Sequence, residues 1–138
     1  KIHKLIDIAT PILCVGETYE ENQNNLTEEV ISEQLRVFEG LNFKNKIVVA
    51  YEPVWAIGTG MTPSKLEINE IHKFIKDVVQ SSSVNSLIPS VLYGGSVNEE
   101  NCENIFKSEF VDGALIGGAS LDGSSFAKIV MSFNGSYK

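Results

Sequence analysis

Residues 50–60 read Ala-Tyr-Glu-Pro-Val-Trp-Ala-Ile-Gly-Thr-Gly and join the end of a strand to an unusual loop. The run at 47–51 is continuously apolar, which is typical of a strand covered on both faces in a parallel α/β sheet. Glu52 is the first charge after this run, and Pro53 cannot donate to a ladder. We therefore expect Glu52 at the carboxyl-end rim of the sheet, where α/β proteins build their sites.

The loop that follows Glu52 has an unusual composition. We expect the next helix to begin after Ser64, because the Ser64 hydroxyl can cap it while Glu67 reaches back to complete a capping box. Residues 53–63 are then a loop, yet residues 54–57 are apolar where a passive surface connection would be polar. Two glycines follow and leave the backbone free to move. This composition indicates a mobile lid.

Strand-like and helix-like segments alternate along the rest of the chain. Buried strands are predicted by four apolar runs, at residues 12–15, 47–51, 89–93 and 111–116. Apolar side chains at helical spacing predict a helix after each strand, with Thr27 and Asn98 as caps of the first and third. The last helix would bury an apolar face made of Phe126, Ile129, Val130 and Phe133. Residues 1–6 show the same periodicity and indicate the end of a further helix.

This alternation predicts one α/β domain over residues 1–138, with no internal domain boundary. Strands that alternate with helices at this pitch are parallel and joined by right-handed crossovers. Alone, the four units amount to half of an eight-stranded barrel. Because the open edges of a parallel sheet are an aggregation liability, we expect partners for the first and last strands.

Composition and charge narrow the classes of function. The chain has 43% hydrophobic residues, which is normal for a globular domain, and its 18 acidic and 11 basic residues give a net charge of −7. This charge argues against nucleic acid or an anionic membrane as a partner. No apolar run approaches membrane-spanning length and no signal peptide is visible, so we expect a cytoplasmic protein.

The cysteines and histidines receive no chemical role. Cys14 and Cys102 lack metal-binding spacing, fit a reducing compartment and are interpreted as core packing residues. His3 is expected at the surface, and His72 is expected to be a structural or exposed residue of the helix after Ser64. We predict no metal and no cofactor.

Four segments together resemble the triosephosphate isomerase family. They occur in the family's order and read Ile-Leu-Cys-Val-Gly-Glu-Thr at 12–18, Tyr-Glu-Pro-Val-Trp-Ala-Ile-Gly-Thr-Gly at 51–60, Tyr-Gly-Gly-Ser-Val at 93–97 and Gly-Ala-Leu-Ile-Gly-Gly-Ala-Ser-Leu at 113–121. The resemblance covers the whole chain but only the second half of the family's barrel. It implies a (β/α)8 TIM barrel of which this chain supplies the last four β/α units.

The resemblance implies an isomerase that interconverts dihydroxyacetone phosphate and D-glyceraldehyde 3-phosphate by proton transfer through an enediolate. Glu52 would be the base, and the lid at 53–63 would close over the phosphate of the substrate. Closure would bring Ile57 over Glu52 while Leu115 presses from the other side. This apolar clamp would strip water from the carboxylate and make it a stronger base.

Two glycine-containing corners at successive strand ends indicate an anion site. Gly95-Ser96 and Gly117-Gly118 come directly after expected strands, where glycines let main-chain N–H groups approach an anion closely. The resemblance implies that the phosphate is held by the N–H groups of Gly58, Ser96, Gly117 and Gly118. A site built of main-chain dipoles suits an acidic protein.

The resemblance implies three supports of the lid, which are Glu17, Trp55 and Tyr93. Glu17 would accept a hydrogen bond from the Trp55 indole when the lid shuts. Asn22 stands where the family commonly has an arginine, so the ion pair made by that arginine is lost here.

The far hinge of the lid also departs from the family. The family leads one to expect a hydrogen bond between the Tyr93 hydroxyl and the main chain at this hinge. Pro63 has no N–H, so this hydrogen bond cannot form here. We predict a stiffer hinge, with a latch that rests on Ser96 and Gly60.

The resemblance also identifies what this chain lacks. The family requires an asparagine, a lysine, a histidine and a further glutamate at strand ends that cannot be placed here. The oxyanion of the enediolate would then have no electrophile, and loss of even one such donor lowers the rate by roughly two to three orders of magnitude. We therefore predict that this chain alone is inactive and that the working enzyme, a homodimer by resemblance, includes an amino-terminal half-barrel.

Two alternatives remain at this point. One is a noncatalytic half-barrel that binds phosphate or assembles with itself. The other is a different phosphosugar barrel enzyme, which would share the glycine corners but has no reason for a lid that carries Trp55. The preferred interpretation places the protein in glycolysis and gluconeogenesis.

Overall fold

The computed structural model describes residues 8–43 and 46–135, and it contains one parallel sheet with strand order β1-β2-β3-β4. The strands are β1 (Ile12–Val15), β2 (Val48–Tyr51), β3 (Ser90–Tyr93) and β4 (Gly113–Ala114). Their register places one residue from each strand in a row across the sheet, namely Val15, Tyr51, Tyr93 and Ala114. The carboxyl ends of the strands therefore meet at one edge of the sheet, which is where the candidate residues follow.

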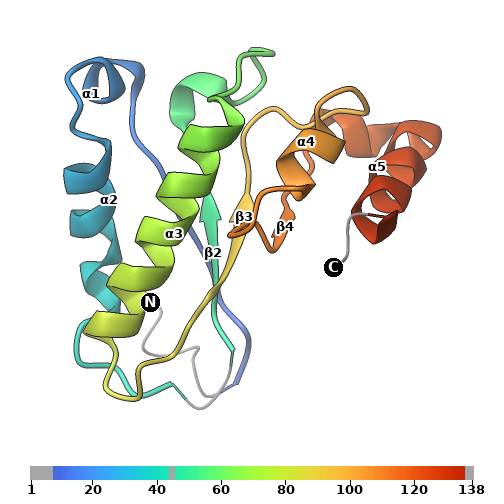
Figure 1. Cartoon of the computed structure of the whole chain (residues 1–138). Coiled ribbons are helices and arrows are strands. Elements are labelled where there is room, and N and C mark those ends of the chain that lie inside the picture. The colour runs from blue at the N-terminus through green and yellow to red at the C-terminus, as the bar shows by residue number, and fades with distance from the viewer. Residues whose placement is uncertain (1–7, 44–45, 136–138) are drawn as a thin grey trace.

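Helices follow every strand. They are α1 (Tyr19–Gln23) and α2 (Thr27–Leu35) after β1, α3 (Lys65–Ser82) after β2, α4 (Cys102–Phe106) after β3 and α5 (Gly123–Gly135) after β4. Short 3-10 turns occur at η2 (Arg36–Phe38), η3 (Val54–Ala56) and η4 (Gly118–Leu121). Figure 1 shows α2 and α3 side by side, and α5 beside α4 at the end of the sheet formed by β4. The predicted α/β fold class with parallel strands is confirmed.

Local capping interactions explain where the helices begin. Ser64 caps α3 as predicted, because its hydroxyl accepts from the Glu67 N–H at 3.2 Å and the Glu67 carboxylate accepts from the Ser64 N–H at 2.7 Å. Thr27 is the first residue of α2 rather than its cap, and its hydroxyl accepts from the Asn22 amide at 3.4 Å instead. Asn98 lies outside α4 and closes a turn of its own, in which its side-chain oxygen accepts from two main-chain N–H groups. The predicted caps at Thr27 and Asn98 are therefore wrong.

The core lies between the sheet and its helices. The strands contribute Val49, Tyr51, Val91 and Tyr93, and the helices contribute Ile31, Leu35, Ile68, Ile75 and Val79. Burial of a side chain of this size stabilises the fold by roughly 1.5–3 kcal/mol. This core packs α2 and α3 against β2 and β3.

The opposite face of the sheet is open. Ile12 is 53% exposed and Cys14 is exposed, whereas Val15 between the sheet and the helices is buried. The prediction that Cys14 packs in the core is wrong, while Cys102 is buried as predicted. Successive side chains point to opposite faces of a sheet, and the exposure of the face that bears Cys14 is greatest at β1, since Ala50, its partner on β2, is fully buried.

The last β/α unit packs more loosely than the others. β4 has two residues, fewer than the run that predicted it. Ile129 of α5 is buried and Phe133 stacks edge-on against Phe106 at 5.0 Å, but Phe126 and Val130 are 41% and 42% exposed. An apolar hollow of about 250 Å³ lies between these side chains and β4. The predicted burial of Phe126 and Val130 is wrong because α5 lies at the open edge of the sheet.

The helix predicted at residues 1–6, together with His3, lies outside the described residues. Within the described ranges, no helix is both long enough and apolar enough to cross a membrane.

Candidate active site

Glu52 directly follows β2, at the carboxyl edge of the sheet. Its main-chain N–H donates to the Val15 carbonyl at 2.7 Å, which extends the pairing of β1 and β2 by one residue. Gly94 leaves room for its side chain, since a Cβ at Gly94 would lie 2.5 Å from the Glu52 Cγ and 3.0 Å from its Oε1. Gly16 does the same for the main chain, because a Cβ there would lie 1.9 Å from the Glu52 carbonyl oxygen. Gly16 and Gly94, at the ends of the two strands beside β2, thus leave the space that Glu52 occupies.

The Glu52 carboxylate lies on the open face of the sheet. Tyr51 before it points to the helices and is buried, so the alternation of a strand turns Glu52 the other way. The exposed thiol of Cys14 lies near it on the same face. Partial burial and the neighbouring Glu52 carboxylate both raise the pKa of the Cys14 thiol. Glu52 is therefore half-exposed at the rim rather than packed under the helices.

The lid lies against the loop that follows β3. The Ser96 hydroxyl donates to the Ala56 carbonyl at 2.6 Å and accepts from the Gly60 N–H at 3.2 Å. Gly58 and Gly60 adopt φ values of +68° and +79°, which L side chains rarely adopt. The predicted contact between Ser96 and Gly60 is present, and it joins the lid to a candidate phosphate-binding residue.

Glu17 anchors the other side of the lid. It is fully buried, and its Oε1 accepts from the Trp55 indole N–H at 2.8 Å, from the Asn22 amide at 3.2 Å and from the Tyr51 hydroxyl at 3.3 Å. Burial, and after it the charge of Glu17, raises the pKa of Tyr51. Asn22 therefore donates to Glu17 as an uncharged partner.

Tyr93 is buried with a hydroxyl that finds no hydrogen-bond partner among residues 8–43 and 46–135. Gly95 lies against it, because a Cβ at Gly95 would lie 2.2 Å from the Tyr93 oxygen. Burial raises the pKa of Tyr93, with a further contribution from Glu17, so the hydroxyl stays protonated. Pro63 has no N–H to offer this hydroxyl, and the effect of Pro63 on the lid stays a prediction.

His72 is a residue of this region whose burial was not predicted. It lies on α3 with no exposed surface, and its ring is 6.0 Å from that of Tyr51 and 6.4 Å from that of Tyr93. Burial is the main cause that lowers the pKa of His72 to about 4. Its position four residues after Ile68 and three before Ile75, in the buried seam of α3, is the sequence signal that indicates this burial.

The remaining candidates lie at the same edge of the sheet but are less closely linked. Gly117 and Gly118 follow β4, are exposed, and have open space where a Cβ would be. Leu115 is half-buried and its N–H donates to the Tyr93 carbonyl at 3.0 Å, whereas Ile57 is 49% exposed. In the described part of the chain, the clamp of Ile57 and Leu115 is therefore not sealed over Glu52.

Parallel strands, each followed by a helix, and polar groups gathered at their carboxyl ends define the chain as part of a β/α barrel. Comparison with known proteins gives the family. The family model described as triosephosphate isomerase matches residues 3–133, and the chain belongs to that family.

Curated relatives agree with this assignment. The triosephosphate isomerase of Pseudoalteromonas translucida is 48% identical over 132 residues, which cover 91% of this chain and 52% of that protein. That of Chlamydia caviae is 45% identical over 127 residues, covering 90% of this chain and 50% of its own length. The triosephosphate isomerase of Neisseria meningitidis is 48% identical over 120 residues, which cover 87% of this chain and 47% of that protein. The chain thus spans about half the length of the curated relatives that it matches.

Proposed function

We propose that this chain is the carboxyl-terminal half of an isomerase that interconverts dihydroxyacetone phosphate and D-glyceraldehyde 3-phosphate, with Glu52 as the base. One observation carries the proposal. The Glu52 carboxylate is held over Gly94 on the open face of the sheet, and the lid that follows it is latched to the next strand end through Ser96. A base and an anion site on adjacent strand ends are the two parts that proton transfer on a phosphorylated triose requires.

Glu52 would remove a proton from the carbon beside the substrate carbonyl and return it to the neighbouring carbon, through an enediolate. Its carboxylate has the freedom to reach a substrate because it lies at the rim and not in the helix-facing core. When Ile57 and Leu115 close over it, the loss of water would strengthen the base.

Main-chain N–H groups would hold the phosphate. Gly117 and Gly118 are exposed and carry no side chain, which favours close approach of an anion to their N–H groups. Ser96 adds an N–H from the next strand end, and Gly58 adds one from the lid. Dipoles of this kind bind a phosphate without a cationic side chain, which suits a chain with a net charge of −7.

Activity would require the amino-terminal half of the barrel. His72 is buried beneath the sheet and cannot act as an electrophile at the rim. β1 and β4 are the edge strands of the sheet in the described residues, and their unpaired main-chain groups offer the missing strands positions for pairing. We further propose that the complete protein works in the cytoplasm as a homodimer, in glycolysis and gluconeogenesis.

The proposal is tested by restoring the missing half. The chain alone is compared with a fusion in which the amino-terminal half of the Pseudoalteromonas translucida relative precedes it, in a coupled isomerase assay. We expect activity from the fusion and none above background from the chain alone. A fusion that folds, binds inorganic phosphate and still lacks isomerase activity would support a noncatalytic phosphate-binding half-barrel instead.

A further inference from the structure

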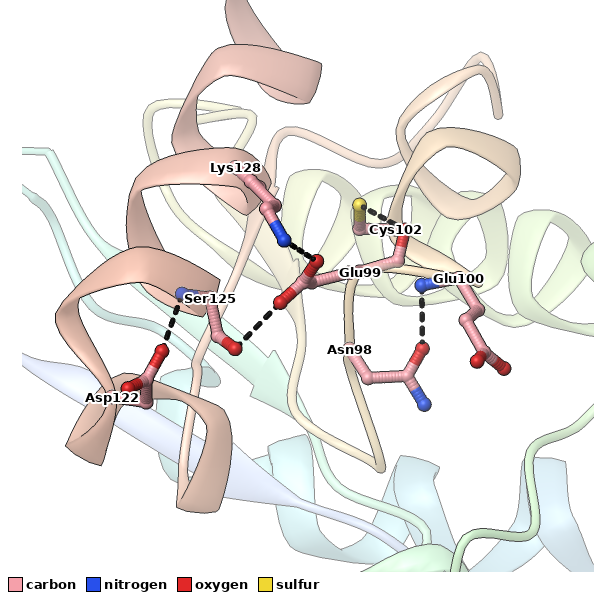
Figure 2. A network of polar contacts seen from close by, with 7 residues as sticks. All are labelled: Asn98, Glu99, Glu100, Cys102, Asp122, Ser125 and Lys128. Carbon is pink, nitrogen blue, oxygen red and sulfur yellow. Dashed lines mark hydrogen bonds and ion pairs between the residues drawn. The ribbon is translucent and has the colours of Figure 1, made fainter.

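Glu99 links the loop after β3 to the helix after β4, as Figure 2 shows. One carboxylate oxygen accepts from the Ser125 hydroxyl at 2.6 Å, and the other pairs with the Lys128 ammonium at 2.6 Å. Ser125 and Lys128 lie in the first turns of α5, which begins at Gly123. The contact therefore joins two consecutive β/α units rather than residues of one helix.

Hydrogen bonds connect the loop that carries Glu99 to Ser96. The Asn101 side chain donates to the Ser96 carbonyl at 2.9 Å and accepts from the Asn98 N–H at 2.9 Å. Asn98 in turn accepts from the Asn101 N–H at 3.0 Å. The residues on both sides of Glu99 in the loop are therefore connected to Ser96 by hydrogen bonds.

The segment that carries Gly117 and Gly118 depends on the placement of α5. β4 ends at Ala114, and the 3-10 turn η4 leads from Gly118 almost directly into α5. The stacking of Phe133 on Phe106 holds the distant end of α5. The bridge from Glu99 holds the end that is nearer to the two glycines.

We infer that Glu99 is a positioning residue for the phosphate site, because it fixes the distance between the Ser96 N–H and the N–H groups of Gly117 and Gly118. The inference rests on the proposed function, in which those groups hold the phosphate. Since an anion must meet several donors at once, a shift of about 1 Å in one strand end relative to the next weakens its binding.

A role of Glu99 through its charge and a role through its position predict opposite effects of Glu99→Gln on phosphate binding. Lys128 and Ser125 lower the pKa of Glu99, so the carboxylate is ionised at neutral pH. If Glu99 acted only through its charge, Glu99→Gln would remove a repulsive charge and tighten phosphate binding. If Glu99 positions the site, the same variant weakens phosphate binding.

The experiment uses the fusion that completes the barrel, with inorganic phosphate as a competitive inhibitor. The inhibition constant, KM, kcat and thermal midpoint are measured for Glu99→Gln and Lys128→Gln. The matched control is Glu103→Gln, since Glu103 pairs with Lys107 one turn along α4 and makes no bridge to α5. Glu99→Lys combined with Lys128→Glu tests rescue, because it reverses the ion pair.

The pair is partly exposed, so we expect Glu99→Gln and Lys128→Gln each to raise the phosphate inhibition constant and KM by only about twofold to fivefold, with kcat less affected. The control should change neither constant, and the reversed pair should regain part of the loss. The inference is overturned if Glu99→Gln tightens binding, matches the control, or lowers the thermal midpoint without changing the inhibition constant. A wild-type fusion that phosphate does not inhibit contradicts the proposed function itself.

Discussion

The Trp55 indole donates to the buried carboxylate of Glu17 at 2.8 Å, which joins the lid to the loop after β1. The same oxygen accepts from Tyr51 and Asn22, so one acceptor satisfies three donors. The Val54 N–H also donates to the Glu17 carbonyl at 2.9 Å. The beginning of the lid is thus hydrogen-bonded to the loop that follows the neighbouring strand β1.

Glu17→Ala should free the lid and destabilise the fold. The substitution leaves the Trp55 N–H and the Tyr51 hydroxyl without their acceptor, which costs about 1–3 kcal/mol for each buried group. Trp55 is the single tryptophan of the chain, so its fluorescence reports the lid directly. We expect a red shift and stronger acrylamide quenching, together with a lower urea midpoint. Glu17→Gln keeps an acceptor and should show smaller changes in the fluorescence, the quenching and the urea midpoint. Equal changes in both variants would contradict the role of this oxygen.

Tyr93→Phe should leave stability unchanged or slightly improved. Its hydroxyl is buried without a hydrogen-bond partner in the described part of the chain, so its removal loses no bond.

Pro63→Ala should loosen the hinge, because it removes a fixed φ, and should also restore a main-chain donor.

Both changes are measured by urea unfolding and by hydrogen exchange of the Gly60 amide, which donates to Ser96. We expect faster exchange in Pro63→Ala, and a measurable loss of stability from Tyr93→Phe only when it is combined with Pro63→Ala. Thr62→Ala, at the neighbouring position, is the control. A large loss from Tyr93→Phe in the original background would show that its hydroxyl has a partner.

His72 should make the stability depend on pH. Burial lowers the pKa of His72 to about 4 in the folded chain, whereas a histidine in an unfolded chain titrates near ~6.5. Between these values the unfolded chain binds a proton that the folded chain does not, so stability falls as pH falls from the upper value to the lower. The full loss is on the order of 3 kcal/mol.

His72→Phe keeps a ring of similar size against Tyr51 and Tyr93 but cannot be protonated. The difference in unfolding free energy between wild type and variant, measured from urea midpoints across this pH range, should shift in favour of the variant as the pH falls. Carboxylates contribute to the slope of both proteins and cancel in the difference. A difference that does not change with pH would show that His72 is hydrated or ionised in the folded state.

Sequence reasoning succeeded where the cause is local or the motif is long. The Ser64 and Glu67 capping box needs only two residues that are close in the sequence, and both of its bonds are present. Thr18 and Glu21 carry the same signature and cap α1, a helix that was not predicted because its five residues are too few to show a helical period. The parallel direction of the strands was also predicted, because strands that alternate with helices are joined by crossovers.

Features that depend on packing between elements distant in the sequence could not be predicted from local patterns. Cys14 lies in an apolar run, but its exposure depends on whether another element covers that face of the sheet. Ile129 and Phe126 lie on the same predicted apolar face of α5, yet of the two only Ile129 is buried, because α5 lies at the open edge of the sheet. The bridge from Glu99 to Lys128 joins residues from different units, which no local pattern indicates.

The most direct test of the account is the isomerase activity of Glu52→Gln in the fusion that completes the barrel. A general base contributes roughly 100- to 10,000-fold to the rate, so we predict a fall in kcat of that size, while the inhibition constant for phosphate and the thermal midpoint stay unchanged. Glu100→Gln, an exposed carboxylate in the loop after β3, should be silent as a control. A Glu52→Gln fusion that keeps its kcat would contradict the assignment of Glu52 as the base.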